Sequence, residues 1–404
     1  MDADDRLLPC VVLGLETQIG LNIVRELGRA GVRVIGVAQS PHAMGLRSKY
    51  LWKGLVEPRL RSPDLLALLQ DIGRMHGACP LLAISEANLL WLQQHREALA
   101  PLRPALPDPQ ALATVLDKRA TLAAAESVGL EVPRTWQPLS TDDALAGAAS
   151  FPLPAVLKWS DPNGVTRVLG EAGLALLKSE YVTTAKELAD ALGRYDHLGQ
   201  WPIVQQYCPG YGLGQFFFMH RGKALRRFQH RRVCEWPPEG GASCVADAVS
   251  LSQHTELQAR SEALLRSIGW EGVAMVEFRY DPQSGQSWLM EINGRFWGSF
   301  PLSVSCGAGF ARLAYAAAAG LPFPELPPVR QDLRSRMLGN ELKRLVRVLF
   351  RPDRIPDRNF VRRPWAETLR FLGDFLNPRS RYYIADLDDP APLLVDVANL
   401  MLRR

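Results

Sequence analysis

Two carboxylates and an amide stand in two apolar stretches that are close together in the sequence. GVAMVEFRY contains Glu277, and SWLMEIN contains Glu291 and Asn293. The DPQSGQ segment between them is a Pro/Gly turn, so the pair predicts a β-hairpin. Because side chains alternate along a strand, Leu289, Glu291 and Asn293 are expected on one face of the second strand.

The polar face of this hairpin suits a metal ion and a phosphate. A register that closes symmetrically on the turn places Glu277 opposite Glu291, and like charges directly opposite each other destabilise a sheet. A divalent cation would compensate them, because Mg²⁺ prefers oxygen ligands and often bridges carboxylates to substrate phosphates. Asn293 adds a neutral oxygen, and Arg295 can hold a phosphoryl oxygen or a carboxylate through its planar guanidinium.

These residues alone leave two other interpretations open. One is a solvent-facing polar edge of a hairpin. The other is a pair of carboxylates that act as general acid and base on a glycoside. Nothing else in the sequence indicates a sugar-binding cleft.

The elements that must position this face begin with a parallel α/β layer. Residues 8–40 read as strand, helix and strand, and PLLAIS followed by EANLLWLQQHREAL repeats the pattern. Parallel strands joined by a crossover helix define a doubly wound layer. Gly14 and Gly20 do not form a G-x-G-x-x-G fingerprint, so we interpret them as closing a tight strand-to-helix turn. The prolines of APLRPALPDPQ mark a domain boundary.

Ser85 and Glu86 end a predicted strand of this layer. Ligands gather at the carboxyl ends of strands in open α/β sheets, so both residues are candidates for contacting a substrate. Capping of the following helix by Ser85 is the alternative interpretation. Farther along, helices and strands alternate from 112 to 195, residues 201–300 are rich in predicted strands, and the chain turns helical and basic after about residue 325.

Composition excludes several classes of protein. The 404 residues are 47% hydrophobic and carry a net charge of +5, which is too mild to indicate a nucleic-acid partner. The six cysteines form no C-x-x-C motif, so neither a zinc site nor a disulfide framework is predicted, and a reducing compartment fits best. The acidic start MDADDRLLPC is unlike a signal peptide, and no apolar run is long enough to span a membrane.

The basic surplus is local to the C-terminal part. From Arg330 to Arg363 there are 11 Lys/Arg against 4 Asp/Glu. MLGNELKRLVRVLF predicts a helix in which Leu338, Leu342, Leu345 and Leu349 form an apolar stripe that packs on the body, while its basic residues lie toward other faces. Attachment to an anionic membrane surface, or to a protein partner, is the alternative.

Four segments, read in order, resemble ATP-grasp ligases. They are VLDKRATLAAAESVGLEVPRTW, FPLPAVLKWSD, PIVQQYCPGYG and the hairpin with its continuation, VEF…LMEINGRFWGS. The resemblance covers roughly residues 8 to 325 and depends on the order of the motifs rather than on any one of them. HRRVCEWPPEGGAS and RSRYYIADLDDPAPLL are similar to a bacterial subgroup of predicted ATP-grasp carboxylate–amine ligases.

The resemblance implies a mixed α/β and α+β fold in three parts. A Rossmann-like pre-ATP-grasp domain would occupy residues 1–110. A two-lobed ATP-grasp domain would follow at 111–325, with a small lobe at about 120–202 and a large lobe at about 203–325. A basic helical extension would occupy 326–404.

The same resemblance implies roles for individual residues. Backbone groups of Gln206 and Cys208, in the IVQQYC hinge, would read the adenine edge; the family commonly has Gln-Glu where this chain has Gln205-Gln206. The segment 160–173 would be a loop that closes over the phosphates, and Arg232 with loop 240–243 would bind the acceptor or the phosphoryl group. The implied site therefore has catalytic residues Arg295, Lys158 and Arg232, ATP-binding residues Lys118, Lys158, Gln205, Gln206, Tyr207 and Cys208, and metal ligands Glu277, Glu291 and Asn293.

The implied function is an ATP-dependent carboxylate–amine ligase. ATP and Mg²⁺, with Mn²⁺ as an alternative metal, would activate a carboxylate as an acyl phosphate, which an amine then converts into an amide. The expected partners are small-molecule or peptide carboxylates and amines, a homodimer is open, and the expected location is the cytoplasm. An ATP-grasp-fold kinase and a nucleotide-binding scaffold without turnover are the alternatives, and the sequence does not identify the two substrates.

Overall fold

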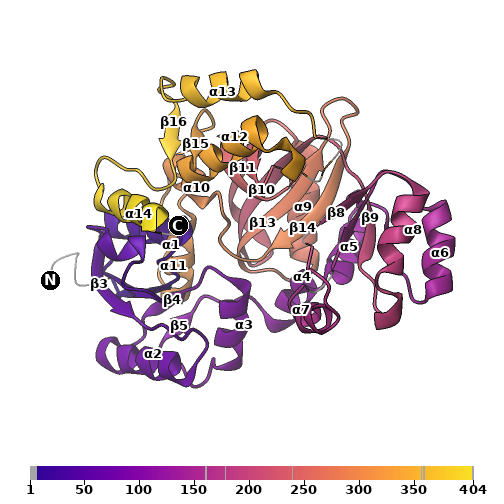
Figure 1. Cartoon of the computed structure of the whole chain (residues 1–404). Helices are drawn as coiled ribbons and strands as arrows, with labels where there is room; N and C mark the ends of the chain where they lie inside the picture. Colours follow the sequence, from indigo (N-terminus) through magenta and orange to yellow (C-terminus); the bar gives the residue numbers. More distant parts are fainter. Residues whose placement is uncertain are drawn as a thin grey trace.

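The computed structural model describes residues 7–159, 162–177, 179–238, 240–355, 357 and 360–402. Three sheets organise these residues: an N-terminal parallel sheet, a small antiparallel sheet and a long, mostly antiparallel sheet (Figure 1). The mixed α/β and α+β fold class expected from the sequence is thus confirmed. The predicted domain boundaries remain predictions.

The N-terminal sheet has the strand order β3-β2-β1-β4-β5, and every pair in it is parallel. At its first strand-to-helix turn, Thr17 accepts a hydrogen bond from the N–H of Gly20 and caps the helix. A Cβ on Gly20 would lie 2.3 Å from the carbonyl oxygen of Gly14, so the two glycines close a tight turn, as interpreted. The elements are β1 (Cys10–Leu13), α1 (Gln18–Arg29), β2 (Val34–Ala38), η2 (Met44–Arg47), β3 (Leu51–Val56), α2 (Pro63–His76), β4 (Pro80–Leu82), α3 (Glu86–Gln94) and β5 (Arg103–Pro104).

Two helices, α4 (Pro109–Leu116) and α5 (Lys118–Ser127), lead into the small lobe. Its sheet has the order β6-β9-β7-β8, and its paired strands are antiparallel. It has a separate hydrophobic core, to which Phe151, Leu188 and Val204 belong. The elements are β6 (Thr135–Trp136), α6 (Thr141–Ser150), β7 (Ala155–Lys158), α7 (Pro162–Glu171), β8 (Glu180–Val182), α8 (Ala185–Gly193), η3 (Asp196–Leu198) and β9 (Ile203–Gln206).

The long sheet has the strand order β14-β13-β10-β11-β12-β15-β16 and carries the predicted hairpin at one edge. Its pairs are antiparallel except β15 with β16. The elements are β10 (Tyr211–His220), β11 (Lys223–Trp236), β12 (Ala242–Ala248), α9 (Thr255–Ser267), β13 (Gly272–Tyr280), β14 (Ser287–Asn293), α10 (Phe300–Ser305), α11 (Phe310–Ala319), β15 (Arg334–Arg336) and β16 (Ser380–Tyr382).

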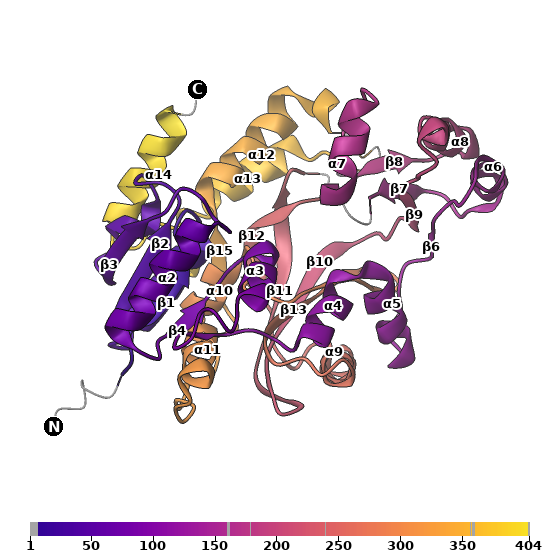
Figure 2. The ribbon, with the colours of Figure 1, turned by 90° about the horizontal axis from the view of Figure 1, so that it is seen from below.

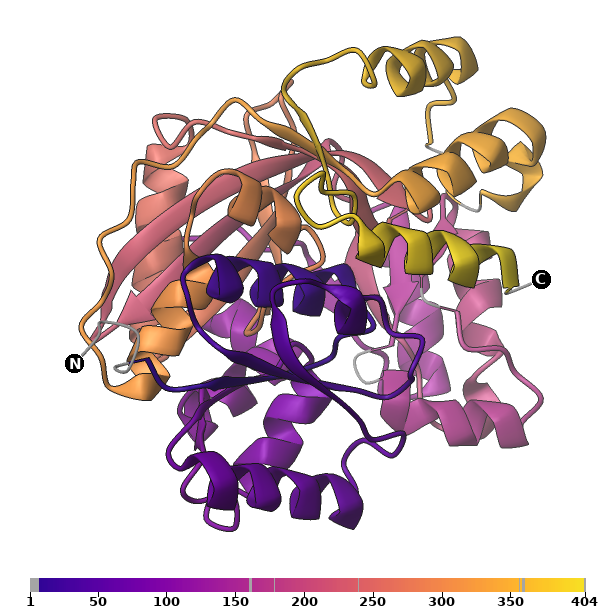
Figure 3. The same cartoon turned by 90° about the vertical axis from the view of Figure 1, so that its left-hand side faces the viewer.

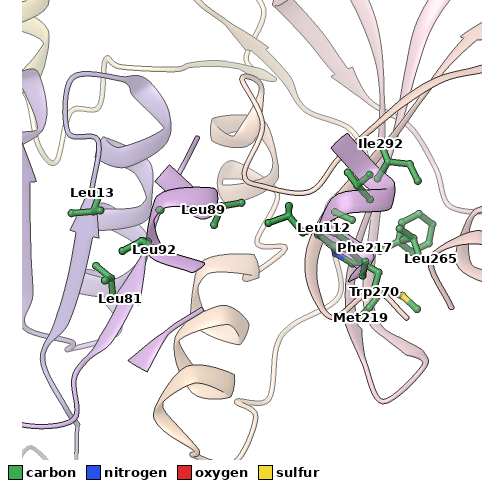
Figure 4. Packing of buried hydrophobic residues seen from close by; sticks show 14 of the residues in the cluster. Leu13, Leu81, Leu89, Leu92, Leu112, Phe217, Met219, Leu265, Trp270 and Ile292 are labelled. Atoms are coloured by element: carbon green, nitrogen blue, oxygen red, sulfur yellow. The ribbon is translucent and has the colours of Figure 1, made fainter. Parts of the chain in front are cut away.

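One continuous hydrophobic core joins the N-terminal domain to the large lobe. It runs from Leu13 and Leu89 of the parallel layer, through Leu112 of α4, to Phe217 and Ile292 of the long sheet (Figure 4). Burial of apolar surface at roughly 25 cal/mol per Å² holds these two parts together as one body. The small lobe, with its own core, stands to one side of that body (Figure 2).

The C-terminal part differs from the purely helical extension that was expected. It contains three α-helices, α12 (Leu338–Phe350), α13 (Pro364–Gly373) and α14 (Ala391–Leu402), and the short helix η4 (Pro352–Arg354). However, β15 and β16 also extend the long sheet, and α14 lies against the N-terminal domain (Figure 3). Arg25 of α1 and Asp389 form an ion pair with a 2.9 Å Nε–Oδ2 distance, and both side chains are buried.

The predicted apolar stripe of α12 is only partly correct: Leu345 is buried and Leu338 and Leu349 are half-buried, but Leu342 is exposed. The buried face consists of Glu341, Arg344, Leu345 and Val348, whereas Leu342 is 50% exposed. Arg344, which the prediction placed on an outer face, forms an ion pair with Glu367 instead. The spacing of leucines was an incomplete guide because buried ion pairs also join this helix to its neighbours. Among the described residues, no helix is both long and apolar enough to cross a membrane.

Candidate active site

The register of the β13–β14 hairpin places Glu277 directly opposite Glu291, as predicted. A bulge lies between this pair and the next one, Phe278 with Leu289. The bulge gives β14 one extra residue, so Leu289 lies in the hydrophobic core with Ile292 and not on the polar face with Glu291. The expectation that Leu289 and Glu291 share a face is therefore wrong, while the opposed glutamates are confirmed.

Arg232 reaches the same face from β11, across the intervening strand β10. Its guanidinium donates to Glu277 with a 2.5 Å Nη2–Oε2 distance, and both side chains are largely buried. The Arg232 side chain can cross β10 because this strand has a glycine, Gly212, at the crossing point. A Cβ on Gly212 would lie 2.6 Å from Cδ of Arg232. The arginine also contacts Glu235 at 3.4 Å and the carbonyl oxygen of Gly241 at 3.3 Å. Arg232 thus contacts the 240–243 loop, with which the sequence analysis grouped it.

A chain of hydrogen bonds fixes the other end of the polar face. Asn293 donates from Nδ2 to Oε1 of Glu291 at 2.9 Å, and Arg295 donates from Nη2 to Oδ1 of Asn293 at 2.9 Å. Arg295 also pairs with Glu86 of α3, with a 3.3 Å Nε–Oε1 distance. The amide oxygen of Asn293 thus accepts a hydrogen bond from Arg295 while its nitrogen orients Glu291, and the predicted role of Asn293 as a metal ligand remains a prediction.

Two lysines face these carboxylates. Lys118 begins α5, where Asp117 caps the helix, and Lys158 ends β7 of the small lobe. Desolvation lowers the pKa of Lys118, against the opposing charges of Glu291 and Glu277. Desolvation and the nearby Lys118 charge lower the pKa of Lys158 to about 8, although both glutamates oppose the shift. The structure thus brings both predicted lysines within electrostatic reach of both glutamates.

The pKa values of the two glutamates shift in opposite directions. Burial raises the pKa of Glu277, with the Arg232 charge opposing the shift and the Glu291 charge adding to it. Desolvation also acts on Glu291, but the hydrogen bond from Asn293 and the charges of Lys118 and Arg232 outweigh it and lower the pKa of Glu291. Glu291 is exposed, and its polar partners stabilise the charged carboxylate. At neutral pH it is ionised and accessible.

The predicted hinge joins the two lobes through the end of β9. Lys158 donates to the side-chain oxygen of Gln205 at 3.3 Å, and Gln205 is buried. The N–H of Gln206 donates to the carbonyl of Arg134 at 2.8 Å, and the N–H of Tyr207 donates to Pro154 at 3.0 Å. Of the backbone groups predicted to read adenine, the Gln206 N–H is therefore engaged elsewhere. The Gln206 carbonyl accepts a weak bond from the Cys208 thiol at 3.6 Å.

Two other sequence expectations change in the structure. The segment 160–173, expected as a Gly-bearing loop, is mostly the helix α7, and its first two residues lie outside the described residues. Ser85 caps α3 by accepting a hydrogen bond from the N–H of Asn88, so the capping interpretation is confirmed. Glu86 holds Arg295 rather than standing free for a substrate.

Sequence reasoning missed several residues around Arg232. Glu235 lies 3.4 Å from Arg232 and 3.8 Å from Arg279, so it links two arginines. His230 is fully buried, and neither ring nitrogen has a hydrogen-bond partner among the described residues. Burial and the Arg232 charge lower its pKa well below the usual range, so it is neutral. Gly214 lies between His230 and Glu277 in the sheet register. This glycine was the one feature of the sequence that could have indicated that these side chains lie close together.

The donor set fits a magnesium–nucleotide site better than a protein-only metal site. No group of three or more His, Cys, Asp or Glu suited to a metal ion occurs in the part of the chain that the structure describes. Two carboxylates, Glu277 and Glu291, are available on one face. Mg²⁺ is commonly held by one or two carboxylates together with substrate phosphates and water, so a nucleotide would complete the set.

A cavity of about 430 Å³ opens beside Arg295, between the N-terminal domain and the large lobe. Its walls are mainly apolar, with Leu89, Trp270 and Phe296 among them, and Arg96 and Arg295 line it as well. It does not include the two lysines or the two glutamates. It is therefore a chamber next to the charged face and not the charged face itself.

Comparisons with known proteins agree with this geometry. Residues 237–340 match a family model described as ATP-grasp in the biosynthetic pathway with Ter operon. The carbamoyl phosphate synthase large chain of Thermus thermophilus is 25% identical over 388 residues, which cover 90% of this chain and 35% of that protein. The chain thus spans about a third of the length of this relative.

Solved structures share the fold at low sequence identity. A biotin carboxylase–ATP complex from Campylobacter jejuni superposes with a TM-score of 0.61 and 14% identity, over 80% of this chain and 74% of that one. An L-amino acid ligase from Bacillus licheniformis superposes with a TM-score of 0.55 and 16% identity, over 78% of this chain and 74% of that one. These similarities show that the chain has the ATP-grasp fold.

Proposed function

We propose that this protein is an ATP-dependent carboxylate–amine ligase that releases ADP and phosphate. The observation that carries the proposal is the pair of opposed glutamates, Glu277 and Glu291, facing Lys118 and Lys158 across the cleft. Anionic phosphates would neutralise the lysines, and the carboxylates would hold Mg²⁺, which lowers the charge on the transferring phosphoryl group.

The adenine of ATP would lie against the hinge. The adenine edge offers an amino donor and a ring-nitrogen acceptor. The N–H of Gln206 is already used. We therefore expect the adenine amino group to donate to the Gln206 carbonyl, where it would displace the weak thiol contact from Cys208. The Cys208 N–H would donate to the adenine ring nitrogen. Side chains of Gln205 and Tyr207 then shape the pocket without reading the base. The phosphates would extend toward Lys158, which already contacts Gln205.

The proposed ligation takes place in two steps, phosphoryl transfer to the carboxylate and then attack by the amine. A substrate carboxylate oxygen forms a bond to the γ-phosphorus, the bond from that phosphorus to the β,γ-bridging oxygen breaks, and ADP leaves. The amine nitrogen then attacks the carbonyl of the acyl phosphate, inorganic phosphate leaves, and the amine loses a proton. Arg295 would stabilise negative charge on the transferring phosphoryl group, because the Asn293 and Glu86 contacts hold its guanidinium beside the metal face.

Arg232 would act on the amine side of the same face. Its guanidinium is fixed by Glu277 and Glu235 and lies next to neutral His230. Of these groups, the partly exposed Arg232 and Glu235 offer a donor and an acceptor to a polar substrate, whereas His230 is fully buried. The cavity beside Arg295, with its apolar walls, is the proposed place for the body of the carboxylate substrate. All six cysteines are free and buried, which fits a reducing compartment such as the cytoplasm.

A hydroxamate assay tests this function. The protein is incubated with ATP, Mg²⁺, hydroxylamine and pools of amino acids, small acids or peptides, without another amine. ADP together with a hydroxamate is the expected product. Release of AMP and pyrophosphate would mean adenylate chemistry, and a stable phosphorylated product that never reacts with hydroxylamine would mean a kinase. Neither result is compatible with the proposed ligase.

A further inference from the structure

We propose that the outer face of α13 is the contact between two copies of this chain. This face consists of Trp365, Leu369, Leu372 and Leu376, which are 81%, 70%, 57% and 87% exposed. Their spacing of four, three and four residues places them on one side of the helix and its last turn. The proposal concerns a surface away from the nucleotide cleft and does not depend on the proposed function.

The inner face of α13 is polar and is already used. Glu367 pairs with Arg344 at 3.0 Å, Arg370 pairs with Glu341 at 3.0 Å, and Asp374 pairs with Arg334 at 2.7 Å. These ion pairs join α13 to α12 and to β15. The polar face of the helix therefore cannot turn outward without breaking buried charge pairs, which is costly.

The helix is thus oriented opposite to an ordinary surface helix. A surface helix of a soluble protein normally turns its apolar stripe to the core and its charges to water. No residue of α13 is buried, and the helix lies at the outer edge of the molecule, outside α12 (Figure 1). An apolar stripe held outward by buried ion pairs needs another surface to cover it.

A second copy fits this stripe for two reasons. Apolar residues at alternating spacings of four and three are the pattern of helix–helix seams. The four large apolar side chains of the stripe are 57–87% exposed, and they would form the apolar centre of an interface that buries about 800 Å² on each partner. Ala366 and Gly373 flank the stripe, and a Cβ on Gly373 would meet nothing within 4 Å, so a second helix has room to approach.

An anionic membrane fits less well. Helices that lie on membranes direct Lys and Arg of their polar face to the lipid headgroups. In α13 the polar face is occupied by α12, and its arginine, Arg370, is paired with Glu341. A symmetric contact needs no such charges, because the same apolar patch covers itself in both copies.

The oligomeric state of the full chain tests the proposal. Sedimentation velocity and light scattering over a range of concentrations should give twice the 44.8 kDa mass of one chain. The double variant Leu369→Asp/Leu372→Asp should weaken dimerisation at least about 10²-fold, while its circular dichroism stays unchanged because both side chains are exposed. Leu139→Asp, at an 85% exposed leucine of the small lobe, is the control and should remain dimeric.

Thiol crosslinking provides a second measurement. The six native cysteines are all buried, so Leu372→Cys introduces an accessible thiol. A short bifunctional thiol reagent should link two Leu372→Cys chains at low protein concentration and leave a Leu139→Cys variant unlinked. A wild-type chain that stays monomeric, or a dimer that the double variant leaves intact, overturns the proposal. Binding of the wild type to phosphatidylserine vesicles, lost in the double variant while both proteins are monomers, would assign the face to lipid instead.

Discussion

The two lobes of the ATP-grasp domain contribute opposite charges to one cleft, and they prepare those charges differently. In the large lobe, Glu277 and Glu291 are held by an arginine and an amide before any ligand arrives. In the small lobe, the hydrogen bond of Lys158 among the described residues goes to a neutral glutamine, and desolvation together with the Lys118 charge lowers its pKa to about 8. One side is therefore preorganised, whereas the other has an unfavourable charge that a phosphate would relieve.

The largest effect should come from breaking the preorganised side at its accessible carboxylate. Glu291→Gln keeps the shape of the side chain but removes the charge, so turnover should fall on the order of 10³-fold, several kcal/mol of lost charge stabilisation. Unfolding should change by less than about 0.5 kcal/mol, because Glu291 is exposed. Steady-state ADP release and thermal unfolding measure the two quantities, with the exposed Glu97→Gln as control. Activity within about twofold of wild type would remove Glu291 from the metal site.

The next largest effect should come from Arg295, which is tied to the same side. Arg295→Ala should lower the rate of hydroxamate formation by about 10²–10³, the usual cost of losing one group that stabilises transition-state charge. Arg74→Ala, at a well-exposed arginine of α2 in the N-terminal layer, should leave the rate unchanged. A change confined to the apparent affinity for ATP would make Arg295 a binding residue and contradict its proposed role.

Removal of the Lys158 charge in the small lobe should make the free protein more stable. Because the folded-state pKa of Lys158 lies below the unfolded value of about 10.4, the unfolded chain binds more protons between pH 8 and pH 10.4. This residue therefore makes the free protein more stable as the pH rises through that window. Lys158→Met should abolish that rise and stabilise the free protein at pH 7 by about 1–2 kcal/mol, less than the full shift implies because Lys158 as a whole residue is only partly buried.

The same variant should bind ATP more weakly at pH 7. In the wild type, ATP affinity should decline as the pH rises above about 8, since the free lysine loses its charge there. Thermal unfolding from pH 7 to pH 10 and calorimetric titration with ATP give both readouts, with Lys186→Met in α8 as the control. A Lys158→Met protein that is less stable than the wild type at pH 7 would show that the Lys158 charge does not destabilise the free protein.

The smallest effect should appear at the hinge between the lobes. If adenine is read by the backbone, Gln206→Ala removes only the 3.3 Å contact to the Arg134 N–H and should weaken ATP binding by about 2–10-fold. Gln137→Ala, which affects a side-chain contact to Trp201 elsewhere in the lobe, is the matched control. A loss of more than about 100-fold would mean that the Gln206 side chain reads the base.

Sequence patterns identified the residues of the cleft better than they identified their partners. The hairpin turn and the alternation of side chains were enough to oppose Glu277 to Glu291. The bulge that moves Leu289 into the core was not visible, because it inserts one residue without any glycine or proline to mark it. The Arg232–Glu277 contact joins strands that are not adjacent, so it depends on a glycine in the strand between them rather than on local spacing.

The C-terminal part was the least predictable for a related reason. Periodicity arguments assume that apolar residues face the core, but α12 buries Glu341 and Arg344 and exposes Leu342. The partners that make this possible, Arg336 and Glu367, come from a strand and a helix on either side of it in the sequence. The three-residue strands β15 and β16 are too short to give a pattern. The parallel N-terminal layer, by contrast, repeats strong strand and helix signals and was predicted correctly.

The pairing of Arg25 with Asp389 also bears on the order in which the chain can mature. Arg25 belongs to α1 of the N-terminal layer, yet its guanidinium donates to the carboxylate and carbonyl of Asp389 and to the carbonyl of Ile384, more than 350 residues later in the chain. Asp389 also accepts from Ser48 and from the Lys49 N–H of the same layer. Until the segment with Ile384 and Asp389 has been synthesised, the charged guanidinium of Arg25 must stay hydrated at a place that is dry in the finished protein. The packing around Arg25 is therefore complete only once the C-terminal segment has been synthesised.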